Sequence, residues 1–265
     1  MISVILTTFD RRELVARALA SVFAQTTPAY ETIVVDDGST AGTAEFLRHQ
    51  PIQLLRVPHS GNPAVARNVG LNRARGDLIA FLDSDDTLRA NALKDLSDAL
   101  RAHPAAGFAY GDYEPDAGSR PLAPPVGDIF DRLLESDFLV TGAVLFRRSL
   151  LDTVGGFDPD CSPAEDWDFW LRLAAQVDAV HVPRTVIDIG ISTDSLSRAP
   201  GGSIYAANRR VTRKALRWCL EHRPASIALA RRIHRRSMLA AARYHLHRRT
   251  IAQTVRDLAM VARVR

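Results

Sequence analysis

Residues 79–86 read Ile-Ala-Phe-Leu-Asp-Ser-Asp-Asp, an apolar run followed by acidic residues. The first four form the short apolar run that a parallel strand buried on both faces requires. Asp83, Asp85 and Asp86 follow where that strand should end, the place where open α/β sheets bind ligands. Because Mg²⁺ and Mn²⁺ prefer oxygen ligands, the acids suggest a cation site shared with a nucleoside diphosphate. The stretch alone leaves a second interpretation open, a solvated acidic loop whose last Asp caps the next helix.

Strands and helices alternate around this stretch. Residues 3–8 and 32–35 have the apolar, β-branched character of strands, and residues 11–25 have the apolar spacing of a helix. Asp10 and Glu13 resemble a capping box at the start of that helix. The alternation continues with a strand at 52–57, a helix at 64–75 ended by Gly76, and a helix at 89–102. We therefore predict an α/β fold with a doubly wound, mostly parallel central sheet flanked by helices.

The second half of the chain is less regular. It contains a loop with four prolines at 115–125 and, from residue 200 on, a helical pattern with breaks near Pro224 and His247. The other expected elements are strands at 108–110, 140–146, 179–182 and 186–189, and helices near 128–135 and 165–176.

Charge divides the chain near residue 200. Residues 1–199 contain 18 Lys and Arg against 28 Asp and Glu, a net charge of −10, whereas residues 200–265 contain 16 against 2, a net charge of +14. No apolar run approaches the ~18 residues of a membrane span. Because no basic n-region or cleavage site is seen near Met1, we do not expect secretion. Cys161 and Cys219 have no metal-like spacing. We expect a cytoplasmic protein without a structural disulfide or zinc site.

Polar residues distinguish this sheet from a dinucleotide-binding one. The first strand leads into Thr7-Thr8-Phe9-Asp10-Arg11 without the glycines that NAD and FAD sites require. Two strands instead end in carboxylates, Asp36 with Asp37 and Asp83 with Asp85. An Arg67-Asn68 pair lies on the helix between them.

Six motifs in a fixed order extend this pattern. They are Ser-Val-Ile-Leu-Thr-Thr-Phe-Asp-Arg at 3–11, Val-Val-Asp-Asp-Gly-Ser at 34–39, Ala-Arg-Asn-Val-Gly at 66–70, Gly-Asp-Leu-Ile-Ala-Phe-Leu-Asp-Ser-Asp-Asp at 76–86, Gly-Gly-Phe-Asp at 155–158 and Glu-Asp-Trp-Asp-Phe-Trp-Leu-Arg at 165–172. Together they resemble glycosyltransferase family 2, the inverting enzymes on the GT-A fold, over about residues 1–199.

The resemblance implies a role for each matching residue. On the donor side, Thr8 and Phe9 would line the base pocket, and Asp37 with its neighbour Asp36 would accept hydrogen bonds from the base. Arg67 would hold the nucleotide. Asp83 and Ser84 would contact the nucleotide sugar, with Asp83 at the ribose or the cation. Asp85 would bind Mn²⁺ or Mg²⁺. Asp166 would be the general base, with Glu165 and Trp167 on the acceptor side.

The implied function is transfer of a sugar from a nucleotide-sugar donor to a hydroxyl of a glycan, lipid-linked or small-molecule acceptor, in cell-envelope or polysaccharide biosynthesis. Two alternatives remain. A sugar-phosphate nucleotidyltransferase is disfavoured because the first strand lacks a Gly- and Lys-rich loop. A non-catalytic nucleotide-sugar-binding scaffold stays open because Gly190 and Ser192 stand where many members have Arg and His, shortly before Ser-Leu-Ser-Arg at 195–198.

The predicted organisation is a GT-A domain at 1–199, with nucleotide-sugar binding in about 1–112 and the acceptor side in about 113–199, followed by a basic helical extension at 200–265. Three hypotheses cover the extension: peripheral docking on the anionic inner face of the membrane, a lid or homodimer contact packed on the acidic body, and a solvated basic face. Without a recognition motif, nucleic acid is not an expected partner.

Overall fold

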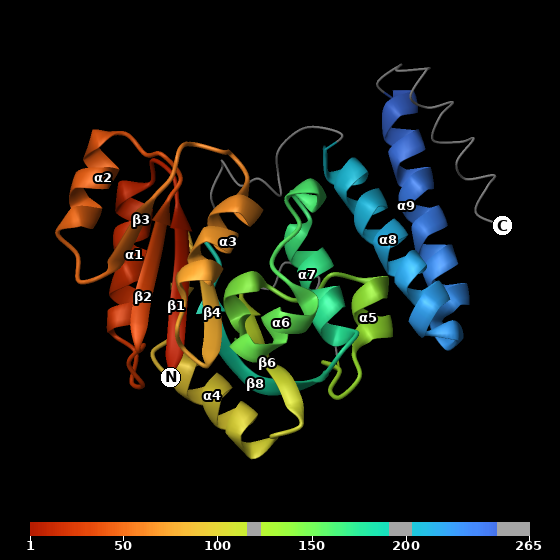
Figure 1. Cartoon of the computed structure of the whole chain (residues 1–265), viewed down its shortest axis with the longest axis horizontal. Coiled ribbons are helices and arrows are strands. Elements are labelled where there is room, and N and C mark those ends of the chain that lie inside the picture. The colour runs from red at the N-terminus through yellow and green to blue at the C-terminus, as the bar shows by residue number, and fades with distance from the viewer. Residues whose placement is uncertain (116–122, 191–202, 248–265) are drawn as a thin grey trace.

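The computed structural model describes residues 1–115, 123–190 and 203–247 (Figure 1). Its centre is an eight-stranded sheet with the order β3-β2-β1-β4-β7-β6-β8-β5. β1 runs parallel to β2 and β4, and β2 runs parallel to β3, whereas β7 is antiparallel to both β4 and β6. The fold class is confirmed, with a sheet that is parallel in its first half and mixed in its second. The strands are β1 Ile2–Thr8, β2 Glu31–Asp36, β3 Gln53–Arg56, β4 Leu78–Asp83, β5 Thr87–Leu88, β6 Ala106–Glu114, β7 Val144–Arg147 and β8 Asp178–Asp188.

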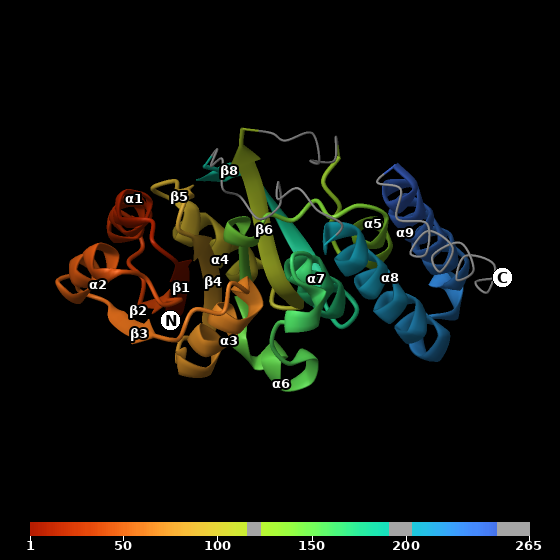
Figure 2. The same cartoon turned by 90° about the horizontal axis from the view of Figure 1, so that it is seen from above.

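Helices cover both faces of the sheet because successive strand residues point to opposite sides. Ile5 and Phe81 face the apolar cluster that includes α3 and α7, while Leu6 and Leu82 face the cluster that includes α1 and α4. Figure 2 shows the sheet passing between these two layers. The helices are α1 Arg12–Phe23, α2 Ala41–Arg48, α3 Pro63–Arg73, α4 Ala92–Ala102, α5 Phe130–Glu135, α6 Leu151–Val154, α7 Glu165–Ala174, α8 Ser203–His222 and α9 Ile227–His247.

The basic helices α8 and α9 are folded against the body of the chain. Their apolar residues, among them Val211, Ala215 and Ile233, belong to the same core cluster as α7. Ion pairs tie α8 and the turn after it to acidic residues of the body: Lys214 of α8 pairs with Asp158 at 2.7 Å, and Arg223 in the turn pairs with Asp128 at 2.5 Å. The packing expected by the second hypothesis is therefore observed within one chain, and the expected break near Pro224 is confirmed by the short 3₁₀ turn Pro224–Ser226.

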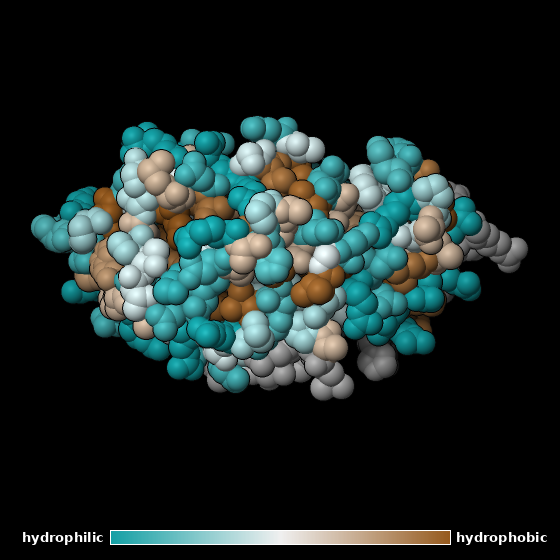
Figure 3. All heavy atoms as spheres, turned by 90° about the horizontal axis from the view of Figure 1, so that it is seen from below, coloured by the Kyte–Doolittle hydropathy of each residue, from teal (hydrophilic) through white to brown (hydrophobic). Residues whose placement is uncertain are grey.

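The surface of the described residues is polar on the face seen from below, where hydrophobic side chains form small, separated areas (Figure 3). Among the described residues, no helix combines the length and the apolar character needed to span a bilayer. The predicted domain boundary, Ser192, residues 195–198 and the chain after His247 lie outside the described residues.

Four local features of the structure differ from the prediction. Asp10 does not cap α1: its φ is +47°, the N-cap residue is Arg11, and the Asp10 carboxylate accepts hydrogen bonds from Thr40 instead. Helix α2 has no counterpart in the prediction. Helix α3 ends at Arg73 rather than at Gly76, where a Cβ would lie 2.6 Å from the Ser3 nitrogen.

The fourth difference concerns the last strand. The two strands predicted at 179–182 and 186–189 are one continuous strand, β8. Residues 183–185, which separated the two predicted strands, belong to β8, and its register with β6 shifts near Gly111 and Asp112.

Candidate active site

The carboxyl ends of three strands meet at the predicted donor side. The sheet register places Thr8 of β1 beside Asp36 of β2, and Thr7 beside Asp83 of β4. The prediction that these strand ends come together is therefore confirmed. Asp36 is fully buried and accepts a hydrogen bond from the Ser39 nitrogen at 2.9 Å, so it closes the turn after β2. The hydroxyl oxygen of Thr8 is buried without a hydrogen-bond partner.

An aromatic pair and a carboxylate form the outer part of this side. Phe9 is 39% exposed, and its ring stacks on His59 with centroids 3.8 Å apart. The Asp37 carboxylate accepts hydrogen bonds from the Ser60 and Gly61 nitrogens at 2.9 and 3.0 Å. His59 was not predicted, although it follows the third strand at the same edge of the sheet as the acids.

The acids after β4 have different environments. Asp85 lies 3.0 Å from an Arg11 guanidinium nitrogen, and burial together with the Asp83 charge raises the Asp85 pKa, although Arg11 opposes this. Asp86 is buried, and burial together with Asp83 raises its pKa to about 8. Asp86 accepts a hydrogen bond from the Gly190 nitrogen at 2.8 Å and does not cap α4, whose N-cap is Asn91. Ser84, between them, is buried.

Gly190 has a structural reason to be glycine. A Cβ at this position would lie 2.1 Å from the Asp85 carbonyl oxygen, a distance that no side chain tolerates. The chain after β8 therefore packs backbone to backbone on the loop that carries Asp85. The absence of a basic residue here follows from this close approach.

Arg67 connects the donor side to the start of α7. Its guanidinium, 5% exposed, pairs with Asp83 at 2.9 Å and with Glu165 at 2.7 Å. Burial alone would lower the pKa of Arg67, but the charges of Asp83 and Glu165 raise it. A buried arginine held by two acids fixes its partners in place more than it adds stability. The structure thus places Arg67 between carboxylates that belong to distant parts of the sequence.

Asp166 lies on the predicted acceptor side. It is half-buried in the first turn of α7 and accepts hydrogen bonds from the Trp167 nitrogen at 2.8 Å and the Thr141 hydroxyl at 3.3 Å. Burial, followed by the charge of Glu165, raises the Asp166 pKa to about 6. Asp137, which was not predicted because it lies in the irregular segment, has its pKa raised well above the usual range by burial and by Asp166.

Trp167 belongs to the core. It is 8% exposed, and its indole nitrogen donates a hydrogen bond to the Leu133 carbonyl at 2.8 Å. The ring therefore packs between α7 and α5.

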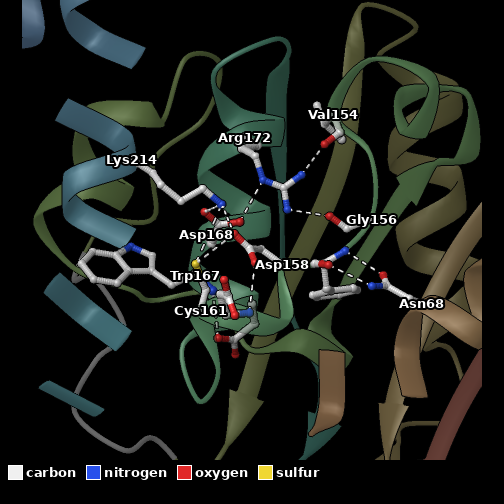
Figure 4. Close-up of polar contacts among 12 residues, drawn as sticks. Asn68, Val154, Gly156, Asp158, Cys161, Trp167, Asp168, Arg172 and Lys214 are labelled. Carbon is white, nitrogen blue, oxygen red and sulfur yellow. Dashed lines mark hydrogen bonds and ion pairs between the residues drawn. The ribbon is translucent and has the colours of Figure 1, made fainter. Parts of the chain in front are cut away.

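Two groups of acidic side chains offer ligand atoms for a cation. Asp83 and Asp85 offer hard carboxylate oxygens at one strand end, a donor set that fits Mg²⁺ or Mn²⁺. The second group, Asp158, Cys161 and Asp168, has ligand atoms within 4.8 Å of one another (Figure 4). The Lys214 ammonium lies 2.7 Å from Asp158 and 2.6 Å from Asp168, so this group already has its counter-charge.

Comparison with known proteins identifies the family of this chain. Residues 3–155 match the family model described as glycosyl transferase family 2. The chain belongs to glycosyltransferase family 2. It is a glycosyltransferase, as the motifs implied. Among relatives of this family, the uncharacterized glycosyltransferase YwdF of Bacillus subtilis is 29% identical over 194 residues, which are 69% of this chain and 71% of that protein.

The other comparisons add a further relative and show the fold. The O-antigen biosynthesis protein RfbC of Myxococcus xanthus is 33% identical over 79% of this chain, although the match spans only 16% of that protein. Residues 1–349 of Staphylococcus aureus TarS in complex with UDP-GlcNAc superpose with a TM-score of 0.71 over 99% of this chain and 81% of that one, at 20% identity. The mannosyltransferase PcManGT of Pyrobaculum calidifontis, in complex with GDP-Man and Mn²⁺, gives 0.61 over 98% and 78%, also at 20% identity. These superpositions confirm the GT-A type of fold.

Proposed function

We propose that this glycosyltransferase moves a sugar from a nucleotide-sugar donor to an acceptor hydroxyl by direct displacement, with Asp166 as the general base. The observation that supports this most strongly is Asp166 itself. A half-buried carboxylate with a pKa of about 6, at the start of α7 and joined to the donor side through Glu165 and Arg67, suits a proton acceptor that works near neutral pH.

In this step one bond forms and one bond breaks. The acceptor oxygen forms a bond to the anomeric carbon of the donor while the bond from that carbon to the phosphate oxygen breaks. The nucleoside diphosphate leaves with the electron pair of the broken bond, and the acceptor proton goes to Asp166. Attack from the face opposite the leaving group inverts the configuration at the anomeric carbon.

The donor would be held by the residues at the ends of β1, β2 and β4. We assign the base to the surface around Phe9, His59 and Asp37, and the diphosphate to the region of Asp83, Ser84 and Asp85. Asp83 and Asp85 would hold Mn²⁺ or Mg²⁺, which when bound neutralises the charge that develops on the leaving diphosphate. The complexes of TarS with UDP-GlcNAc and of PcManGT with GDP-Man and Mn²⁺ support this assignment by analogy of fold.

We place the acceptor on the side of α5 and α7, within residues 113–199, with Glu165 positioning Arg67 and Asp166. The name of RfbC and that of the teichuronic acid glycosyltransferase TuaG of Bacillus subtilis favour a cell-surface polysaccharide or its lipid-linked precursor as acceptor. The exposed arginines of α9 favour peripheral contact of residues 200–265 with an anionic membrane that carries such an acceptor.

The test is a panel of UDP-, GDP- and dTDP-sugars in a thermal-shift assay with and without Mn²⁺. A donor that binds the native state raises the melting temperature. We expect one donor class to do so with Mn²⁺ present and to lose this effect in Asp85→Ala. If no donor shifts the wild-type protein under any metal condition, the proposed donor site is wrong. Product analysis by NMR tests the mechanism, since retention at the anomeric carbon would exclude direct displacement.

A further inference from the structure

Arg11 reaches from the start of α1 to the acid assigned to the cation. One of its guanidinium nitrogens lies 3.0 Å from an Asp85 carboxylate oxygen. The two side chains are 26% and 15% exposed, so the pair is partly shielded from water. The contact joins residues 74 positions apart in the chain.

The backbone conformation of Asp10, the residue before Arg11, is fixed by hydrogen bonds. Asp10 has a φ of +47°, a left-handed conformation that is uncommon for a residue other than glycine. Three hydrogen bonds keep it there: its nitrogen donates to the Ser39 hydroxyl at 2.8 Å, and its carboxylate accepts from the nitrogen and the hydroxyl of Thr40. The loop after β1 is thus fastened to the loop after β2, and Arg11 leaves it toward the end of β4.

A guanidinium and a divalent cation at the same carboxylate repel each other. A cation that binds Asp85 must therefore displace Arg11 or bind more weakly because of it. Arginine also suits a diphosphate, because its planar fork donates paired hydrogen bonds to phosphate oxygens. The diphosphate is the anion that arrives together with the cation.

We propose that Arg11 is a donor-binding residue that occupies Asp85 in the free enzyme and transfers to the donor diphosphate when the cation binds. This rests on the proposed cation role of Asp85. It makes Arg11 the coupling element between the two ligands: the cation alone binds weakly, and the nucleoside diphosphate strengthens its binding by giving Arg11 another anion.

The experiment measures Mn²⁺ binding to the full chain by EPR of free aqueous Mn²⁺, and the binding of UDP and GDP at saturating Mn²⁺. We expect Arg11→Gln to bind Mn²⁺ alone about 5- to 10-fold more tightly than the wild type, because the competing charge is gone. We expect the same variant to bind the preferred nucleoside diphosphate about 10-fold more weakly, because a charge-assisted hydrogen bond is lost. Both affinities of Arg11→Lys should lie between those of the wild type and those of Arg11→Gln.

Arg12→Gln is the matched control. Arg12 is the next residue and is exposed, but its guanidinium lies over the Phe46 ring of α2, 5.9 Å from the centroid. Both affinities should stay within twofold of the wild type in this variant.

Two results separate the proposals. If Asp85→Asn leaves Mn²⁺ affinity unchanged both in the otherwise wild-type protein and in Arg11→Gln, the cation site itself is wrong and the Arg11 proposal ends with it. If Mn²⁺ binding depends on Asp85 but Arg11→Gln and Arg11→Lys leave Mn²⁺ affinity unchanged or weaker, Arg11 does not compete for Asp85 and only this inference is overturned.

Discussion

Replacement of Lys214 by Met tests whether the basic helix α8 stabilises the body that carries the candidate base. The Lys214 ammonium pairs with Asp168 at 2.6 Å and with Asp158 at 2.7 Å (Figure 4). Asp168 lies two residues after Asp166 in α7. The substitution removes the charge and keeps an unbranched side chain of similar length, so the change in apolar packing is small.

The magnitude follows from the exposure of each partner. The Asp168 side chain is 3% exposed, but after the substitution it still pairs with Arg172 at 2.9 Å. Removing Lys214 therefore costs less than the ~3–5 kcal/mol of a buried charge left without a partner. A charge-assisted hydrogen bond of this kind contributes ~1.5 kcal/mol. Lys214 and Asp158 are 37% and 33% exposed, and solvent screening limits their interaction to ~0.5 kcal/mol. We therefore expect a loss of about 2 kcal/mol in the free energy of unfolding, or ~4–8 °C in Tm.

The assay is urea unfolding at pH 7.5, followed by circular dichroism, with Tm measured in parallel. Arg213→Met is the control, because Arg213 precedes Lys214 in α8 and is exposed. Arg213→Met should change the free energy of unfolding by less than ~0.5 kcal/mol. An equally small change in Lys214→Met would refute the argument that this ion-pair group holds α8 to α7.

Four further predictions concern the site and the basic helices. Asp166→Asn should lower kcat by ~10²–10⁴-fold. In the wild type, kcat/KM should fall as the pH decreases through about 6, because protonated Asp166 cannot take the proton of the acceptor hydroxyl. Folding raises the pKa of Asp166 from 3.8 to about 6, so ionisation of Asp166 opposes folding progressively between these two pH values and fully above the higher one. Asp166→Asn should therefore raise Tm more at pH 7.5 than at pH 5, and the opposite order would contradict the assigned pKa. Gly190→Ala should lower stability by ~1–3 kcal/mol and weaken Mn²⁺ binding, because the new Cβ meets the Asp85 carbonyl, whereas Gly42→Ala, with nothing within 4 Å, should be tolerated. In liposome flotation with phosphatidylglycerol vesicles, Arg231→Glu/Arg235→Glu should reduce binding relative to wild type, and equal flotation of both proteins would count against membrane contact through α9.

Some parts of the site could be predicted because they lie in regular elements. Asp36, Asp83 and Asp85 follow apolar strand runs, and parallel strands bring their carboxyl ends to one edge of the sheet. The environment of each acid could not be predicted in this way. Asp86 accepts a bond from Gly190, 104 residues away, and Arg67 pairs with Glu165, 98 residues away. Such contacts depend on how the second half of the sheet packs on the first.

The sequence by itself determined the α/β class, the family and the basic character of the C-terminal region, because periodicity, ordered motifs and charge are local properties of the chain. Tertiary structure decided the partners of the charges. It placed Arg11 on Asp85, left no room for a side chain at position 190 beside the Asp85 backbone, and paired Asp158 and Asp168 with Lys214. These outcomes depend on close approaches between segments far apart in the chain, and the spacing of residues along the sequence does not specify those approaches.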